Sequence, residues 1–286
     1  MLRVLDLFSG IGGFSLGLER TGGFETVAFC EIEPFPRKVL AKHWPGVPIY
    51  EDVRTLTADA LARDGITGVE VITGGFPCQD LSTAGKRAGI GEGTRSGLYA
   101  EVLRLACDLR PQFIIMENVA GLLNGPSERP GEWFGRVLGD LACIGYDVEW
   151  ENIPAAALGA PHRRERVWIV AHAPKVNDAK FKGIHSCGQD RQPCDSSSDV
   201  AHANCKHEQG EQPGIPDAQR WPRSVLRSVG SCSHVFAQWK TEPRVGRVAD
   251  GVPNRSHRLA ALGNAVVPQI PQMIGYAILQ AEKERP

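Results

Sequence analysis

Short β-rich runs alternate with stretches of helical periodicity over the first 172 residues, and this alternation limits the folds open to the chain. The runs are RVLDLF, TVAFCEI, VEVITGGF, QFIIMENV, YDVEWENI and ERVWIVA. Two of the segments between them repeat apolar residues every three or four positions: Leu98, Val102, Leu105 and Leu109 in one, and Phe134, Val137, Leu138 and Leu141 in the other. The pattern is typical of βαβ units and predicts an α/β fold with a doubly wound, mostly parallel, Rossmann-like sheet.

The alternation stops at about residue 173. From there to about residue 245 the chain is polar and rich in Ser, Gln, Asp, Pro and Gly, as expected of a small loop-rich domain with little core of its own. An apolar tail from Ile270 to Leu279 then predicts a closing helix that packs on the first domain. We therefore expect one domain from residues 1–172 plus 258–286, and a second, small domain from residues 173–257.

The composition is that of a globular protein in a reducing compartment. No apolar run approaches the ~20 residues that a bilayer span requires. Arg3 and Asp6 interrupt the first apolar run, so it does not have the form of a signal peptide. Eight cysteines without framework spacing fit reduced thiols. These features predict a cytoplasmic protein with no membrane partner.

Charge is distributed unevenly along the chain. Residues 160–260 hold 16 Lys and Arg against 10 Asp and Glu, although the net charge of the whole chain is −1. A basic segment on an acidic body suggests contact with a polyanion. Chance clustering of solvated surface charge is the alternative reading.

A glycine turn followed by two acidic residues predicts a nucleoside-binding site. Gly10, Gly12 and Gly13 in VLDLFSGIGGFSLGLE let the backbone approach a ligand at the end of the first strand. Glu31 ends the second strand, where a carboxylate can bind both ribose hydroxyls. Asp52 ends a third, short strand, PIYEDV, within reach of an adenine amino group. The spaced dinucleotide fingerprint is missing. The combination favours S-adenosylmethionine over NAD, although a ligand-free turn and helix N-caps remain the structural alternatives.

A second group of polar residues follows the fourth and fifth strands, at the same edge of the sheet. Cys78 lies in GGFPCQDLS, between an apolar and a polar run, and Glu117 and Asn118 end the apolar run FIIMENV. A carboxyl at the mouth of an apolar strand tends to have a raised pKa. Arg164 and Arg166 are two residues apart, which predicts that both point to the same side of a strand. Paired guanidiniums can lower a thiol pKa, orient a carboxylate or hold a phosphate.

These motifs, in this order, resemble the DNA cytosine-5 methyltransferase family of bacterial and phage modification enzymes. DLFSGIGG resembles its first cofactor motif, GGFPCQDLS its Pro-Cys nucleophile, ENV its catalytic glutamate, RRER its alternate arginines and RLAALGNAVVP its late motif. The resemblance covers residues 1–172 and 246–286. His162 departs from it, because many members have glutamine there; we expect this to alter loop packing rather than chemistry.

The resemblance implies the following roles. Residues 1–172 plus 258–286 would be the catalytic and cofactor-binding domain, and residues 173–257 the target-recognition domain. The catalytic residues would be Cys78, Glu117, Arg164 and Arg166, with Arg166 reaching the cytosine O2 and Arg164 steadying the loop that bears Cys78. The S-adenosylmethionine pocket, from which S-adenosylhomocysteine leaves, would be lined by Phe8, Gly10, Ile11, Gly13, Glu31, Ile32, Asp52, Pro77, Leu98 and Asn264.

Several polar residues are candidate contacts to double-stranded DNA: Gln79, Ser82, Arg87, Arg220, Arg223 and Arg227. The polar, glycine-containing stretch after Cys78 suits a lid that closes over a flipped cytosine. The segment also contains six possible zinc ligands: Cys187, Cys194, Cys205, His207, Cys232 and His234. Their spacings match no standard finger, so we expect free thiols and no metal.

Alternative functions stay open. One is a tRNA cytosine-5 methyltransferase of the same architecture, and another is a catalytically silent DNA-binding relative. The presence of all four catalytic residues disfavours the silent relative, and the basic variable segment favours duplex DNA over tRNA. We expect a monomer; if the enzyme serves restriction–modification, an endonuclease acting on the same site would be its second partner.

Overall fold

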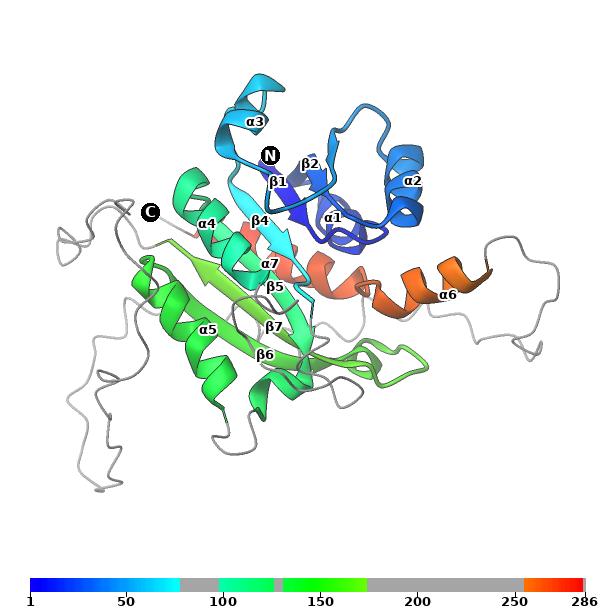
Figure 1. The fold of residues 1–286 in the computed structure, drawn as a ribbon. Helices are drawn as coiled ribbons and strands as arrows, with labels where there is room; N and C mark the ends of the chain where they lie inside the picture. Colours follow the sequence, from blue (N-terminus) through cyan, green and yellow to red (C-terminus); the bar gives the residue numbers. More distant parts are fainter. Residues whose placement is uncertain (78–97, 126–130, 174–254, 285–286) are drawn as a thin grey trace, which may run out of the picture.

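A seven-stranded sheet organises the protein. The computed structural model describes residues 1–77, 98–125, 131–173 and 255–284. The order of the strands is β3-β2-β1-β4-β5-β7-β6 (Figure 1). They are β1 Leu2–Leu7, β2 Phe24–Cys30, β3 Ile49–Tyr50, β4 Val71–Gly74, β5 Phe113–Val119, β6 Asp147–Pro154 and β7 Glu165–His172. All seven occur where the sequence predicts strands.

Most neighbouring strands run parallel. The pairs from β3 through β2, β1 and β4 to β5 are all parallel, whereas β7 is antiparallel to both β5 and β6. The prediction of a doubly wound, mostly parallel α/β sheet is therefore confirmed. The antiparallel strand has a functional consequence, because it begins at the edge where the parallel strands end.

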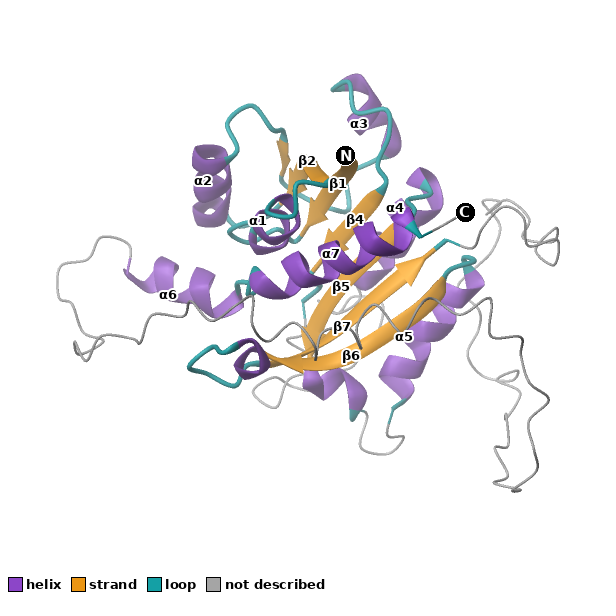
Figure 2. Ribbon diagram, turned by 180° about the vertical axis from the view of Figure 1, so that it is seen from behind, coloured by secondary structure: helices purple, strands orange, loops and turns teal. Residues whose placement is uncertain are grey.

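Helices cover both faces of the sheet. They are α1 Gly13–Glu19, α2 Pro34–His43, α3 Ala58–Arg63, α4 Tyr99–Leu109, α5 Glu132–Cys143, α6 Arg255–Asn264 and α7 Gln269–Lys283, with short 3₁₀ turns η2 Ala120–Leu123 and η3 Ala155–Leu158. In Figure 1, α4 and α5 lie in front of the sheet; the reverse view in Figure 2 shows α7 and α1 on the other face.

Local signals explain where some helices begin. At α3, the hydroxyl of Thr57 accepts a hydrogen bond from the Ala60 N–H at 3.1 Å, which satisfies one of the unpaired donors of the first turn. At α2, Pro34 occupies the first helical position, where its missing N–H has no helical partner to lose.

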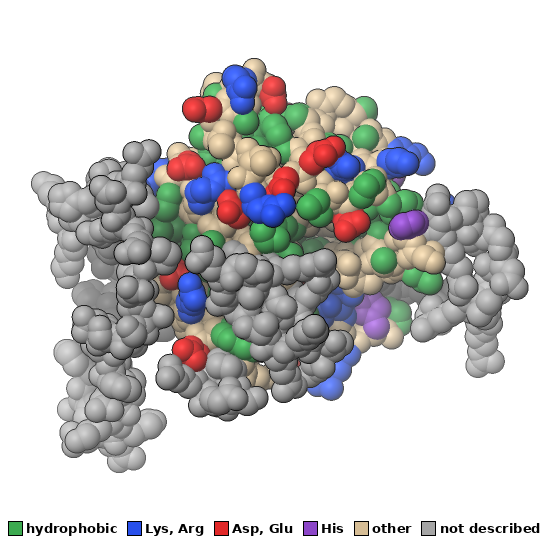
Figure 3. All heavy atoms as spheres, in the orientation of Figure 1, with side chains coloured by type: hydrophobic (Ala, Val, Ile, Leu, Met, Phe, Trp, Pro, Cys, Tyr) green, Lys and Arg blue, Asp and Glu red, His purple; other side chains and the backbone are tan. Residues whose placement is uncertain are grey.

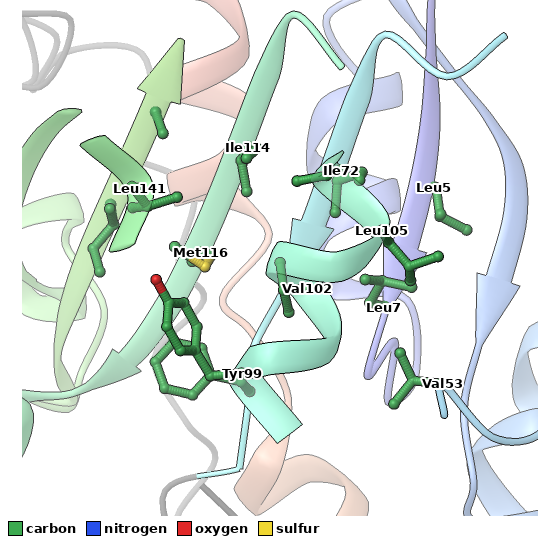
Figure 4. Packing of buried hydrophobic residues seen from close by; sticks show 14 of the residues in the cluster. Leu5, Leu7, Val53, Ile72, Tyr99, Val102, Leu105, Ile114, Met116 and Leu141 are labelled. Atoms are coloured by element: carbon green, nitrogen blue, oxygen red, sulfur yellow. The ribbon is translucent and has the colours of Figure 1, made fainter. Parts of the chain in front are cut away.

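The apolar stripe of α4 packs on the first face. Val102 and Leu105 are completely buried and face Ile72 of β4 and Met116 of β5 (Figure 4). The equivalent stripe of α5, with Phe134, Val137 and Leu141 buried, continues the same core. Burial of each such side chain contributes about 1.5–3 kcal/mol relative to leaving it exposed. The helical faces predicted from the sequence are confirmed.

The opposite core is closed by the end of the chain. Ile274 and Ile278 of α7 are fully buried against Phe14 and Leu18 of α1 and against Trp168 of β7. The ring centroids of Phe14 and Trp168 lie 5.5 Å apart, edge to face. The predicted closing helix is therefore present and holds α1 onto the sheet.

The described surface is of mixed charge. Figure 3 shows Lys and Arg side chains interspersed with Asp and Glu across the described part of one face. None of the helices that the structure describes is long and apolar enough to cross a membrane. Residues 174–254, which make up most of the predicted small domain, lie outside the described residues, so its boundaries remain a prediction.

The close approach of α1 and α7 yields a stability prediction. A Cβ added at Gly17 of α1 would lie 2.2 Å from the carbonyl oxygen of Pro268, whereas one added at Gly139 of α5 would meet nothing within 4 Å. We expect Gly17→Ala to lower the free energy of unfolding by about 1–3 kcal/mol through overpacking. Gly139→Ala should leave it unchanged or raise it by up to about 1 kcal/mol, because alanine is the better helix former. Urea unfolding followed by circular dichroism measures both, and equal effects would contradict the packing argument.

Candidate active site

The antiparallel pairing of β5 and β7 brings two distant motifs together. In its register, Val119 lies opposite Arg166 and Glu117 lies opposite Trp168. The start of β7 thus meets the end of β5. This arrangement places the arginine motif at the carboxyl edge of the parallel strands, where folds of this kind bind ligands.

Glu117 and Arg166 form an ion pair at this edge. The Nε of Arg166 lies 2.9 Å from Oε1 of Glu117, and both side chains are largely buried. Burial raises the pKa of the Glu117 carboxyl, while the positive charges of Arg166 and Arg164 oppose the rise. The carboxyl is therefore poised to hold a proton more readily than an exposed glutamate does.

The segment that leads to Cys78 passes directly beside this carboxyl. A Cβ added at Gly75 would lie 3.4 Å from Oε2 of Glu117. One residue on, the carbonyl oxygen of Phe76 accepts a hydrogen bond from the buried side-chain amide of Asn118 at 3.1 Å. Pro77 is the last described residue before Cys78. The segment that follows β4 is thus held by Asn118 and lies beside Glu117.

Arg164 departs from the sequence-based expectation. It precedes β7 and has a positive φ of 32°, which breaks the alternation of a strand. Its guanidinium donates to the carbonyl oxygens of Gly263 at 2.8 Å and Ala265 at 2.6 Å. The prediction that both arginines point to the same side of a strand is therefore wrong for Arg164. Its predicted contact with the Cys78 loop falls partly outside the described residues; the observed contacts are with the late motif.

The glycine turn after β1 has the open geometry that its sequence predicts. Gly10 and Gly12 have φ of +53° and +83°, and Phe8 adopts a positive φ of 51°. A Cβ at Gly10 would meet nothing within 4 Å, so the space beside the turn is open. Positive φ values strain side chains other than glycine and, outside glycine, concentrate at functional sites.

Glu31 closes one side of this turn. Its Oε2 accepts a hydrogen bond from the Gly10 N–H at 2.7 Å and its Oε1 accepts one from the Glu33 N–H at 2.8 Å. Burial raises the pKa of this carboxyl, and the two backbone donors oppose the rise. Beside it, Ile32 is 61% exposed, which leaves an apolar surface next to a carboxylate.

The late motif returns to the same turn. A Cβ added at Gly13 would lie 2.6 Å from the carbonyl oxygen of Val266, so Gly13 is needed for the contact. The carbonyls that Arg164 binds immediately precede Val266 in the chain. Asn264, the last residue of α6, is exposed beside them. The late motif therefore connects the arginine motif to the glycine turn.

Asp52 is engaged differently from the expectation. Its carboxylate receives hydrogen bonds from Arg54, at 3.0 and 3.1 Å from Nε and at 2.6 Å from Nη2. Hydrogen bonds from Arg54 hold its pKa below the ordinary value. This local partner is not among the sequence-based expectations. A contact of Asp52 with adenine remains a prediction.

The remaining predicted residues lie as follows. Ile11 lines a cleft of about 270 Å³ together with Phe35, Val39, Arg258, Ala261 and Leu262. Leu98 caps the start of α4 and is half-buried. Seven predicted site residues lie outside the described residues: Cys78, Gln79, Ser82, Arg87, Arg220, Arg223 and Arg227. So do all six residues considered for zinc. Within the described ranges, no group of three His, Cys, Asp or Glu side chains could hold a metal ion.

Some residues that support the site without facing it are not indicated by the sequence. Asn118 is recognisable as polar, but its position does not predict its hydrogen bond to the segment before Cys78. Ser15 and Thr73 are further cases, because both donate hydrogen bonds to the buried carboxylate of Asp6. The available signal was the presence of Asp6 and Thr73 inside otherwise apolar strands, where an isolated polar side chain requires a partner.

Comparisons with known proteins find methyltransferases among the relatives of this chain. Type II methyltransferase M2.BsuMI of Bacillus subtilis (strain 168) is 36% identical over 192 residues, which cover 65% of this chain and 46% of that protein. Type II methyltransferase M.Sau3AI of Staphylococcus aureus is 35% identical over 190 residues, covering 63% and 45%. A crystal structure described as a prophage-encoded DNA modification methyltransferase of E. coli superposes with a TM-score of 0.50 at 29% identity, covering 60% of this chain and 47% of that one. The chain thus spans about half the length of these relatives.

A family model gives the assignment. The model of the C-5 cytosine-specific DNA methylase matches residues 2–219. The match includes part of the polar middle segment, which the motif comparison left unmatched, and it stops before the late motif RLAALGNAVVP. Because it covers well over half of the sequence, the chain belongs to the C-5 cytosine-specific DNA methylase family.

Proposed function

We propose that this protein methylates C5 of a flipped-out cytosine in a specific sequence of duplex DNA, with S-adenosylmethionine as the methyl donor. The observation that carries the proposal is the position of the Glu117–Arg166 ion pair beside Gly75, three residues before Cys78. A thiol, a proton-holding carboxyl and a guanidinium at one sheet edge are the groups that activation of a cytosine ring requires.

The residues around the glycine turn fit S-adenosylmethionine. Glu31 offers a carboxylate, partly satisfied by two backbone donors, that can accept from ribose hydroxyls. Ile32 offers an exposed apolar side chain that an adenine ring would cover. The open space beside Gly10 leaves room for the ligand. When bound, S-adenosylmethionine supplies an electrophilic methyl group and leaves as S-adenosylhomocysteine.

The chain's own residues would activate the base. Cytosine C5 is a weak nucleophile, so the Cys78 thiolate attacks C6 and forms a carbon–sulfur bond. Glu117 donates a hydrogen bond or a proton to N3, which stabilises the electron pair pushed into the ring and gives C5 enamine character. Once C5 carries the methyl group, its proton is lost to a base and the C6–sulfur bond breaks, releasing 5-methylcytosine and free Cys78.

Arg166 supports this step through Glu117. Its Nε holds Oε1 of the carboxyl, which leaves Oε2, the oxygen nearest Gly75, to face a base that enters beside the segment before Cys78. Its guanidinium can also donate to the cytosine O2. In this proposal Arg164 acts at a distance, by holding the carbonyls of Gly263 and Ala265 and thereby the late motif.

Access to the base requires that it leave the duplex, because an enzyme cannot reach a stacked C6. Flipping costs a few kcal/mol, which contacts to the DNA must offset. Gln79, Ser82, Arg87, Arg220, Arg223 and Arg227 remain the predicted DNA contacts, and residues 173–257 the predicted recognition domain. The names of the relatives as Type II methyltransferases support a role in DNA modification, with a restriction endonuclease as a further partner.

Covalent trapping tests the proposed reaction. Duplex DNA of mixed sequence containing 5-fluorocytosine is incubated with the protein and S-adenosylmethionine. Because fluorine at C5 cannot leave as a proton, the final elimination is blocked. We expect a complex that survives denaturant, requires the methyl donor and disappears in Cys78→Ala. Gel electrophoresis measures it, and Cys143→Ala, which changes an exposed thiol of α5, is the matched control that should still form the complex.

The same experiment separates the alternatives. An adduct on similarly substituted tRNA but none on DNA would replace the DNA proposal with the tRNA enzyme. DNA binding without any adduct, on a DNA library that covers all short sites, would favour the silent relative. An adduct that persists in Cys78→Ala would refute the assignment of the nucleophile.

The pKa of Glu117 predicts a pH dependence. If protonated Glu117 assists at N3, the single-turnover rate falls as the pH rises through its raised pKa. Arg166→Met removes the charge that lowers this pKa, so the alkaline fall should move to higher pH even though the maximal rate decreases. Arg166→Lys keeps the charge and should move the fall less. A fall that stays in place, or moves to lower pH, in Arg166→Met would argue against Glu117 as the proton-holding group.

Glu31 gives a test of the cofactor that is independent of catalysis. Glu31→Gln removes the charge that would accept from the ribose, and hydrogen bonds to charged groups contribute about 1.5–3 kcal/mol. We therefore expect the Kd for S-adenosylhomocysteine, measured by calorimetry, to rise at least about tenfold. Glu33→Gln, an exposed carboxyl two residues on, is the control and should leave the Kd unchanged. Similar affinities for wild type and Glu31→Gln would remove Glu31 from the proposed pocket.

A further inference from the structure

Asp6 is a completely buried carboxyl that the mechanism above does not use. It lies in β1, with its Oδ1 accepting a hydrogen bond from the Thr73 hydroxyl at 2.8 Å and its Oδ2 accepting one from the Ser15 hydroxyl at 2.7 Å. Within the described residues, no salt bridge neutralises it. Burial raises the pKa of Asp6 to about 7, and the hydrogen bonds from Ser15 and Thr73 oppose the rise. Burial of an ionisable side chain without a charged partner lowers the stability of the fold, and an apolar residue at this strand position would avoid that loss.

The two hydroxyls belong to the two halves of the site. Thr73 pairs with Asp6 in the β1–β4 register, and β4 ends at Gly74, four residues before Cys78 in the sequence. Ser15 lies in the first turn of α1, immediately after the glycine turn. One carboxylate therefore holds both the segment that leads to the nucleophile and the helix that follows the cofactor turn.

The backbone of Asp6 is also linked, through Ser9 and Cys30, to the side of the cofactor turn that carries Glu31. The carbonyl oxygen of Asp6 accepts a hydrogen bond from the Ser9 hydroxyl at 2.5 Å, and the Ser9 oxygen accepts one from the Cys30 N–H at 3.2 Å. Cys30 immediately precedes Glu31, whose carboxylate binds Gly10. The contacts of Asp6 thus extend to both sides of the turn.

We propose that Asp6 is a positioning residue that couples the cofactor turn to the end of β4, four residues before Cys78. The coupling rests on the proposed function, since it concerns the two halves of that site. Its hydrogen bonds lie where water cannot replace them, so a shift of α1 on ligand binding is passed to Thr73 rather than absorbed by solvent. Binding of the methyl donor would thereby order the segment before Cys78, and changes at either end would alter the other.

The coupling is tested by removing the hydroxyl at one end of the site and measuring the effect at the other end. Thr73→Val, at the nucleophile end, should raise the Kd for S-adenosylhomocysteine at least about fivefold, the lower end of typical coupling between sites. Ser15→Ala, at the cofactor end, should slow covalent trapping of 5-fluorocytosine DNA by a similar factor even at saturating S-adenosylmethionine. Thr26→Val is the matched control, because the buried side-chain hydroxyl of Thr26, on the neighbouring β2, has no hydrogen-bond partner among the described residues. It should change neither quantity.

Two substitutions of Asp6 itself separate coupling from folding. Asp6→Asn keeps one acceptor and one donor, and both hydroxyls can rotate to match them, so binding and trapping should stay within about twofold to threefold of wild type. Asp6→Ala breaks both bridges; at temperatures where circular dichroism shows it folded, it should show both defects together. Loss of stability alone, with normal Kd and normal trapping rate in the folded protein, would overturn the proposal.

The outcomes also distinguish this inference from the proposed function. If Thr73→Val slows only trapping and Ser15→Ala weakens only ligand binding, the coupling is refuted while the methyltransferase activity stands. If wild type neither binds S-adenosylhomocysteine nor traps cytosine, the proposed function fails, and the coupling fails with it. Equal defects in Thr26→Val would show that any lost hydroxyl in this core has the same effect, which would also refute a specific role of Asp6.

Discussion

The antiparallel pairing of β5 with β7 is the interaction on which the site depends. A parallel strand in that position would begin at the opposite edge of the sheet, far from the end of β5. The antiparallel register instead sets Arg166 two positions from the point opposite Glu117, close enough for Nε to hold Oε1 at 2.9 Å. Burial alone would strongly favour the neutral, protonated form of Glu117. The positive charge of Arg166 lowers the pKa but does not cancel the rise, so the carboxyl holds a proton more readily than an exposed glutamate does.

Much of the fold could be predicted from the sequence because the helices and strands follow from the local spacing of apolar residues. Apolar residues of α4 recur at Val102 and Leu105, and strands such as FIIMENV are short, apolar and bounded by polar residues. The edge at which the motifs meet also follows from general rules, since parallel strands place their carboxyl ends together. Glu31 and Glu117 are predicted as site residues for this reason, because each follows the end of an apolar strand.

The contacts that could not be predicted link residues far apart in the sequence or depend on a single backbone angle. Asp6 and Thr73 are 67 positions apart, and no periodicity indicates that their side chains meet. Arg164 looked equivalent to Arg166 because alternate residues of a strand share a face. Its positive φ of 32° places it outside that rule, and its guanidinium donates hydrogen bonds to the carbonyl oxygens of Gly263 and Ala265. Sequence spacing alone could not show where β7 begins.

The late motif, RLAALGNAVVP, connects the two halves of the site, which are the glycine turn and the group formed by Glu117 and the arginines. Gly13 and Gly17 of α1 lie against the backbone of Val266 and Pro268, and Arg164 binds the carbonyls just before them. Residues from the start, middle and end of the described chain therefore meet around one turn. A displacement of this segment would disturb both the glycine turn and the contacts of Arg164, so the geometry of the turn and the charge around Glu117 are linked through it. Asp6 makes the corresponding connection from inside the sheet, between the same turn and the end of β4.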